Sequence, residues 1–103
     1  MTEKNIQQQI RLWLSLNNYI PLRLNVGRFF TEDGRPVNAG LPVGTSDLVA
    51  IQPGTGRAIF IECKAEKGRP TLEQLNFIRV MKQQGALAGV AYSINDAIKI
   101  IGG

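Results

Sequence analysis

The chain has 103 residues, with 12 Lys and Arg against 8 Asp and Glu, a single cysteine and no histidine. This composition excludes a disulfide framework, a Cys/His zinc site and every histidine-based acid–base or nucleophilic scheme, so carboxylates and lysines are left to carry any catalysis. The net charge of +4 permits attraction to a polyanion such as nucleic acid. The length predicts a single domain over residues 1–103.

The first predicted element is an amphipathic helix over about residues 3–17, which begins after Thr2, a favourable N-cap residue. Apolar side chains recur there at helical spacing, at Ile6, Ile10, Trp13 and Leu14. We interpret Trp13 as a core residue rather than as a platform for a nucleic-acid base. Charges such as Glu3 and Arg11 in this stretch predict neither a signal peptide nor a membrane span. We therefore expect a soluble protein in a reducing compartment.

A strand is predicted next from "YIPLRLNVGRFF" at residues 19–30, with Pro21 near its start. Its apolar and polar side chains alternate, with Leu22, Leu24 and Val26 set against Arg23 and Asn25. Residues 30–46 are rich in Gly and Pro, which predicts a long loop or a hairpin. Long loops in small domains are often functional.

The second half of the chain predicts a hairpin and a final βα pair. "DLVAI" (47–51) and "RAIFIECK" (57–64) read as two strands around the turn "QPGTG". A helix follows from Thr71 to the stop at Gly85, then a buried strand "LAGVAYS" and a short helix "INDAIKII". The apolar stripe of the helix that starts after Thr71 is predicted to contain Leu72, Leu75, Ile78 and Met81. The order α-β-β-β-α-β-α predicts an α/β fold with a mixed central sheet flanked by helices.

Two charges end a strand that is otherwise apolar on both faces. Side chains alternate along a strand, so Glu62 and Lys64 share one face and Cys63 lies on the other, where we interpret it as a small buried hydrophobe. Charges at such a position are costly unless an ion or a substrate compensates them. Asp47 opens the partner strand, and antiparallel pairing would place it beside residues 62–64.

Two carboxylates and one ammonium are the parts of a magnesium-dependent phosphodiesterase. Mg²⁺ prefers oxygen ligands, usually one or two carboxylates together with water and phosphate. Asp47 and Glu62 could supply those carboxylates, and Lys64 could orient the attacking water. The competing interpretation is an ordinary ion pair of these acids with Arg57 or Lys64 at a sheet edge.

The same residues resemble a known family. "GTSD" at 44–47 and "ECK" at 62–64 resemble the pattern of the PD-(D/E)XK nuclease superfamily, with Ser46 in the place of the proline. "IECKAEKGRPTLEQLNFIRVMKQQGALAGVAYSINDAI" is similar to the VRR-NUC family, and "MTEKNIQQQIRLWL" to its first helix. The resemblance covers nearly the whole chain and fits the stand-alone phage and bacterial members. It implies a restriction-endonuclease-like αβββαβ core.

By this resemblance the protein would be a Mg²⁺- or Mn²⁺-dependent endonuclease that cuts structured or branched DNA, such as a flap or a Holliday-like junction, in DNA repair. It would be a homodimer in a bacterial cytoplasm, and a phage or prophage could encode it. The resemblance assigns the site residues by motif position: Asp47, Glu62 and the Cys63 carbonyl as metal ligands, Lys64 as the catalytic lysine, Gln74 as the motif glutamine and Glu3 as an acid from the first helix.

Two of these assignments have structural alternatives. Gln74 fits a capping box with Thr71, and Glu3 is favoured in a first helical turn by the helix dipole. Gln7, one turn after Glu3, could face the site in its place.

Four cations border the predicted site, Lys67 and Arg69 after the acidic strand and Arg28 and Arg35 beside the Gly/Pro-rich stretch. They could clamp phosphates on both sides of the cleaved bond, or they could form a solvated basic rim. Two other functions remain open from the sequence. One is a catalytically silent nucleic-acid-binding module, and the other is a nuclease acting on RNA or on free ends.

Overall fold

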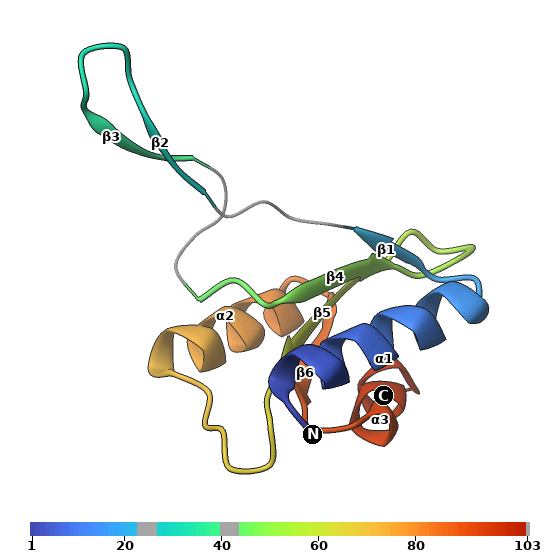
Figure 1. The fold of residues 1–103 in the computed structure, drawn as a ribbon. Helices are drawn as coiled ribbons and strands as arrows, with labels where there is room; N and C mark the ends of the chain where they lie inside the picture. Colours follow the sequence, from blue (N-terminus) through green and yellow to red (C-terminus); the bar gives the residue numbers. More distant parts are fainter. Residues whose placement is uncertain (23–26, 40–43, 103) are drawn as a thin grey trace.

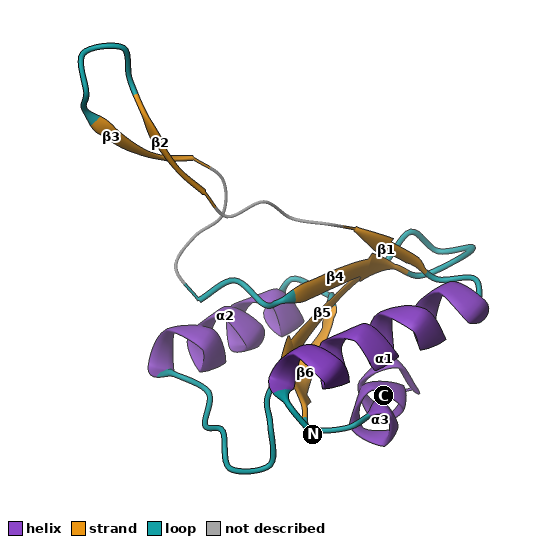
Figure 2. Ribbon diagram, in the orientation of Figure 1, coloured by secondary structure: helices purple, strands orange, loops and turns teal. Residues whose placement is uncertain are grey.

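The computed structural model describes residues 1–22, 27–39 and 44–102 (Figure 1). Figure 2 shows which segments are helices, strands and loops. In chain order the elements are α1 (Glu3–Leu16), β1 (Ile20–Leu22), β2 (Gly27–Phe30), β3 (Pro36–Ala39), β4 (Leu48–Ile51), β5 (Ala58–Cys63), α2 (Leu72–Gln83), β6 (Leu87–Ala91) and α3 (Ile94–Gly102). None of the described helices is long and apolar enough to cross a membrane.

The central sheet has four strands in the order β1-β4-β5-β6. Its first two pairings are antiparallel, and β5 pairs with β6 in parallel, so the sheet is mixed. Helices α1 and α3 pack together on one face, and α2 packs against β5 and β6 from the other (Figure 1). The predicted α/β class and the mixed sheet flanked by helices are confirmed.

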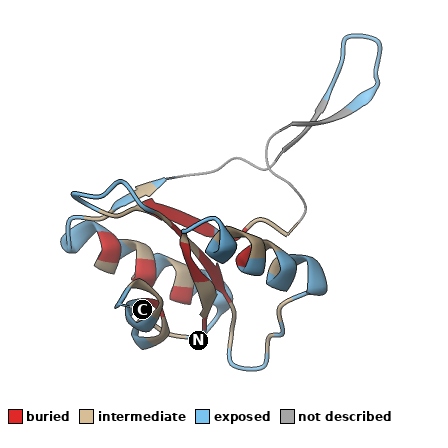
Figure 3. Ribbon diagram, turned by 180° about the vertical axis from the view of Figure 1, so that it is seen from behind, coloured by how far each residue is buried: buried red, intermediate tan, exposed pale blue. Residues whose placement is uncertain are grey.

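Helix α1 supplies much of the core. The Thr2 hydroxyl accepts a hydrogen bond from the Asn5 N–H at 3.1 Å, which satisfies one of the free amides at the helix start. Ile6, Ile10 and Leu14 are buried, and Figure 3 shows the buried positions on the inward side of this helix and on the central strands. Trp13 packs against this core and stacks on Tyr19, so its interpretation as a core residue is confirmed.

The predicted β4–β5 hairpin is present. Leu48 pairs with Ile61 and Ile51 with Ala58, which places Asp47, one residue before β4, beside Glu62. Along β5 the two faces differ: Ile59, Ile61 and Cys63 are fully buried in the core shared with α1, whereas Phe60 makes an edge-to-face contact with Phe77 of α2. Glu62 therefore lies on the α2 side of the strand.

The single strand predicted over residues 19–30 is wrong. Residues 20–22 pair with β4 in the central sheet, whereas residues 27–30 pair with β3 in a separate two-stranded sheet. Alternation of apolar and polar side chains indicates an extended chain but does not identify the strand that pairs with it. The prediction therefore merged two strands that belong to different sheets. Positions 23–26 of the pattern lie outside the described residues. The hairpin alternative for the Gly/Pro-rich stretch is confirmed by the β2–β3 pairing around a turn that contains Gly34 at φ 84°.

The stripe predicted on α2 is only partly correct. Ile78 is buried, but Leu72 is 83% exposed and Leu75 is 45% exposed. The helix is rotated so that Gln74 and Phe77 face β5, because the amide of the first contacts Glu62 and the ring of the second packs on Phe60. The two leucines lie beside that contact face rather than on it.

Candidate metal centre

Three carboxylates from three separate elements meet at one end of the sheet. Glu3 comes from the first turn of α1, Asp47 precedes β4 and Glu62 lies near the end of β5. One carboxylate oxygen of each lies within 4.8 Å of those of the other two. The structure thus brings together the three acids that were proposed as site residues. Glu3 reaches the group from the helix start, as the resemblance implies.

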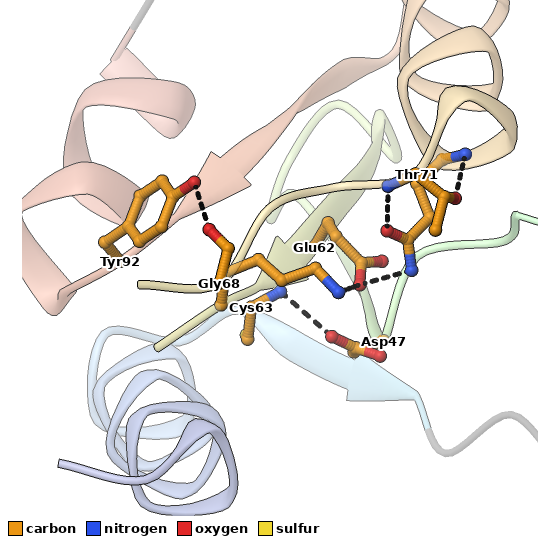
Figure 4. Close-up of polar contacts among 8 residues, drawn as sticks. Asp47, Glu62, Cys63, Gly68, Thr71 and Tyr92 are labelled. Atoms are coloured by element: carbon orange, nitrogen blue, oxygen red, sulfur yellow. Dashed lines mark hydrogen bonds and ion pairs between the residues drawn. The ribbon is translucent and has the colours of Figure 1, made fainter. Parts of the chain in front are cut away.

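Asp47 is held by the neighbouring strand. The backbone N–H of Cys63 donates a hydrogen bond to Asp47 Oδ2 at 2.9 Å, as Figure 4 shows. This bond continues the antiparallel pairing of β4 with β5 by one more position, with a side-chain oxygen in place of a backbone carbonyl. It fixes the aspartate beside Glu62 and engages one of its two carboxylate oxygens.

Glu62 is the most unusual member of the group, because its side chain is 1% exposed. Its Oε1 accepts a hydrogen bond from Gln74 Nε2 at 3.0 Å and lies 3.5 Å from Lys64 Nζ. Its Oε2 is buried and has no hydrogen-bond partner in the described part of the chain. Leaving a buried charged oxygen unpaired is costly, so a proton or a cation bound to this atom would remove that cost.

The electrostatics point the same way. Burial is the main cause that raises the pKa of Glu62 to about 7, the adjacent Asp47 carboxylate raises it further, and the Lys64 ammonium opposes both. Burial also raises the pKa of the Cys63 thiol to about 12, so that thiol is neutral and inert at neutral pH. Three carboxylates facing one ammonium leave an excess of negative charge when all are ionised.

This donor set fits a hard divalent cation. Mg²⁺ and Mn²⁺ prefer carboxylate, carbonyl and water oxygens, whereas thiolate sites select softer metals. The cluster offers carboxylate oxygens only, and Cys63 packs its side chain into the core, away from Glu62. The unpartnered Oε2 of Glu62 is the atom that a cation in this position would satisfy.

The ion-pair interpretation is partly correct. Lys64, whose side chain is 13% exposed, does pair with Glu62. Arg57 does not take that role, since its Nε donates to the Gly85 carbonyl at 2.6 Å, at the far end of the hairpin. One lysine cannot neutralise three acids, so the ion pair leaves the cluster incomplete.

Gln74 forms the capping box and also contacts Glu62. Its side-chain oxygen accepts from the Thr71 N–H at 2.8 Å and the Thr71 hydroxyl accepts from the Gln74 N–H at 3.1 Å, which is a full capping box. Its NH₂ group is still free to donate to Glu62. The start of α2 is thereby connected to the buried acid.

The four predicted nucleic-acid-binding cations fall in two places. Lys67 and Arg69 are exposed in the turn that follows β5 and line a cavity with Tyr92. Arg28 and Arg35 belong to the β2–β3 hairpin, which extends away from the central sheet (Figure 1). The Arg35 side chain is 81% exposed and pairs with Asp33 at 3.1 Å.

Tyr92, which follows β6, was given no role from the sequence. Its hydroxyl donates to the Gly68 carbonyl at 2.9 Å, and Figure 4 shows the ring reaching across to the turn after β5. An aromatic residue after an apolar strand is a common pattern, so the only available signal was a weak one.

Comparison with known proteins agrees with this geometry. The family model of the VRR-NUC domain matches residues 1–95, which include all three acids, Lys64 and Gln74. A solved structure described as a VRR_NUC domain is similar in fold, with a TM-score of 0.67 and 23% sequence identity over 99% of this chain and 97% of that chain. No curated protein matches the sequence. From the extent of the family match and the shared fold, the chain belongs to the VRR-NUC family and carries a nuclease-type domain.

Proposed function

We propose that this protein is a divalent-metal-dependent endonuclease that hydrolyses phosphodiester bonds in DNA. The observation that carries the proposal is the buried Oε2 of Glu62, unpartnered and part of a group of three carboxylates. An acid held in this way is costly to the fold, and a cation with a phosphate would remove that cost.

Asp47, Glu62 and the Cys63 carbonyl would hold the cation, with Glu3 as an additional acid from α1. A bound Mg²⁺ or Mn²⁺ would supply charge neutralisation on the phosphate and would make water more acidic. The protein's part is to hold the ligands in place. Cys63 N–H fixes Asp47, and the Gln74 amide fixes Glu62, so neither carboxylate has to be reoriented when substrate binds.

Lys64 is the proposed catalytic lysine. It stands beside the acids with its side chain mostly buried, so its ammonium is positioned rather than free in solvent. It would orient the attacking water and stabilise the negative charge that develops on the phosphate. Its backbone N–H donates to the Ala91 carbonyl at 3.0 Å, which attaches this part of the chain to β6.

Lys67 and Arg69 would bind phosphates next to the cleaved bond, where cations offset the repulsion between the acids and the DNA backbone. Arg28 and Arg35 would contact the substrate farther away, on the projecting hairpin. Flaps and four-way junctions, the substrates that the resemblance to the VRR-NUC family implies, are the preferred substrates in this proposal. A homodimer would place a second centre on the opposite strand of a junction.

The direct test is a cleavage assay with Mg²⁺ or Mn²⁺ on single strands, duplex, flap, four-way junction and matched RNA. We expect metal-dependent cutting, strongest on the branched DNA. Binding without cutting would instead identify a silent nucleic-acid-binding module, and preferential cutting of RNA or of free ends would contradict the proposed substrate.

The Lys64→Ala variant should lower kcat by at least about 10²-fold, because a preorganised charge at the reacting phosphate is lost. DNA affinity in Ca²⁺, measured by fluorescence anisotropy, should stay nearly unchanged. Lys99→Ala is the matched control, since it removes the same charge from the exposed side of α3, beside the start of β6. Cutting that survives Lys64→Ala would exclude the role proposed for this lysine.

A further inference from the structure

An open cavity of about 760 Å³ lies at the turn that follows β5. It is lined by the turn of residues 66–69, by Tyr92 and by Met1 and Ile6 at the start of the chain. The turn begins two residues after Lys64, and Met1 stands two residues before Glu3. Two parts of its lining are therefore close in the chain to Lys64 and to Glu3 of the candidate site.

The turn that forms one wall is held in a fixed shape. Gly68 N–H donates to the Ala65 carbonyl at 2.7 Å, and the Gly68 carbonyl accepts from the Tyr92 hydroxyl at 2.9 Å. A Cβ at Gly68 would lie 3.1 Å from the Ala65 carbonyl oxygen, so the chain folds back closely on itself here. This wall exists before any ligand arrives, which favours binding because little ordering is left to do.

Tyr92 is held at both of its ends. Its backbone N–H donates to Asp96 Oδ2 at 2.8 Å, and its hydroxyl is bonded to the turn. Its neighbour Ala91 accepts from the Lys64 N–H. The residue nevertheless remains 36% exposed and lines the cavity. It presents an aromatic ring that is fixed in orientation and tied to the catalytic strand.

The chemistry of the wall selects among ligands. Lys67 and Arg69 outnumber Glu66, so the turn carries a net positive charge. A site for free phosphate alone would not need the exposed ring of Tyr92. An apolar ligand would leave the two cations without a partner. A nucleotide unites both requirements, because its base has an apolar face for stacking and its phosphates bind Lys and Arg.

We propose that this cavity receives one unpaired nucleotide of the substrate, with its base stacked on Tyr92 and its flanking phosphates on Lys67 and Arg69. The inference rests on the proposed nuclease function and refines its substrate class. A base within a duplex cannot reach such a ring without unstacking, so the cavity favours DNA that already contains an unpaired base near the cut. It is one physical source of selectivity for branched over continuous duplex.

The test measures binding without cleavage. A single abasic nucleotide is placed in turn at each position around the branch of a flap, and affinity is measured by fluorescence anisotropy in Ca²⁺. In the wild type, one position should cost about tenfold in affinity, the effect of losing one stacked base. In Tyr92→Leu the intact flap should bind about tenfold more weakly, and the abasic substitution should cost nothing further.

Tyr92→Phe separates stacking from the support of the turn. It keeps the ring and loses the bond to Gly68, so it should retain the abasic penalty. Lys67→Ala should weaken all flaps equally, while Lys99→Ala removes the same charge near the opposite end of β6 and should change nothing. Thermal unfolding of each variant verifies that it is folded. An abasic penalty that is absent at every position, or equal in wild type and Tyr92→Leu, would overturn the inference.

Failure of this inference is distinguishable from failure of the proposed function. If the wild type cuts flaps but shows no abasic penalty, the cavity does not bind a base and the nuclease proposal is unaffected. If nothing is cut with either metal but the penalty depends on Tyr92, the cavity assignment holds and the enzymatic proposal is wrong. A wild type that binds no flap contradicts both.

Discussion

Among single side chains, Glu62 is central to the expected chemistry of this protein. A carboxylate that is 1% exposed, with a pKa raised to about 7, is half protonated near neutral pH. A proton and a divalent cation would compete for the same oxygen, because each neutralises the same buried charge. The acid is therefore expected to couple metal binding, stability and pH.

The stability of the metal-free protein should fall as pH rises from about 5 to about 8. The pKa of Glu62 is higher in the folded protein, about 7, than its ordinary value of 4.5. The folded state thus binds the proton more tightly, and this contribution is complete below the ordinary value and is lost as pH rises through about 7. With no histidine in the chain, few other side chains titrate there. Thermal unfolding in EDTA across this range measures the effect.

Added Mg²⁺ should raise the melting temperature more at the alkaline end of that range than at the acidic end, because metal binding displaces the proton. Glu62→Gln supplies the control, since an amide cannot titrate and should flatten both the pH dependence and the response to metal. A wild-type response to Mg²⁺ that is independent of pH would argue against Glu62 as a ligand.

Gln74 offers a second experiment on one side chain. Gln74→Glu keeps an oxygen for the Thr71 N–H but replaces the donor to Glu62 with a second negative charge. We expect a loss of about 1–3 kcal/mol in the free energy of unfolding without metal, the usual cost of an unsatisfied buried group, and a smaller loss with Mg²⁺. Gln74→Ala also loses the bond to the Thr71 N–H, typically about 1 kcal/mol. Urea unfolding with and without Mg²⁺ distinguishes the two variants. Equal losses in both conditions would mean that Gln74 acts only as a cap.

Among the elements, the loop that carries Asp47 depends on its contact with α2. Gly44 has φ +89°, and a Cβ there would lie 2.4 Å from the Glu73 carbonyl oxygen. Both the backbone conformation and the lack of space therefore require glycine. The contact seats the stretch 44–47 against the first turn of α2, and so helps to place Asp47 beside Glu62.

Gly44→Ala should destabilise the protein by about 2 kcal/mol or more, through backbone strain together with the clash, and should weaken metal binding by shifting Asp47. Gly54→Ala is the matched control in the β4–β5 turn, because it has a similar φ of +83° but nothing within 4 Å of the added methyl. Only the strain, about 1 kcal/mol, should appear there. Urea unfolding and Mg²⁺ titration test both variants, and equal losses would show that the contact with α2 has no role.

The β2–β3 hairpin dominates the outline of the whole molecule, since it projects from the central sheet in Figure 1. It contacts no other described helix or strand. A two-stranded hairpin is only marginally stable alone. Because this hairpin does not pack on the other described elements, it gains little stability from them and contributes little to theirs. Its Arg28 and Arg35 are balanced by Glu32 and Asp33, so the hairpin carries no net charge, whereas the turn of residues 66–69 carries a net positive one.

Replacement of residues 27–39 by a short Gly/Ser linker should leave the melting temperature within about 2 °C of the wild-type value, because the hairpin does not pack on any other described element. Cleavage of four-way junctions should fall more than cleavage of flaps if Arg28 and Arg35 hold a distant arm of the substrate. Differential scanning fluorimetry and the cleavage panel measure the two effects. A large drop in melting temperature would show that the hairpin is part of the fold.

Much of the site was predictable because it arises from local geometry. Alternation along β5 separates Glu62 and Lys64 from Cys63, and the short turn of the β4–β5 hairpin brings Asp47 beside them, so residue spacing alone was informative. The amphipathic period of α1 similarly indicated its buried face. Strand partners were harder to predict, because the alternation over residues 19–30 does not show that its two halves belong to two different sheets.

Contacts between distant elements could not be deduced from the chain alone. Glu3 joins the acids because α1 packs across the sheet, Gln74 reaches Glu62 because α2 is rotated toward Phe60, and Tyr92 meets Gly68 because the ends of β5 and β6 are adjacent. Periodicity records which side of an element is buried. How far a neighbouring layer is turned or shifted depends on the packing of many side chains at once. That packing places the Gln74 amide and the third acid at Glu62, and the Tyr92 ring at the turn after β5.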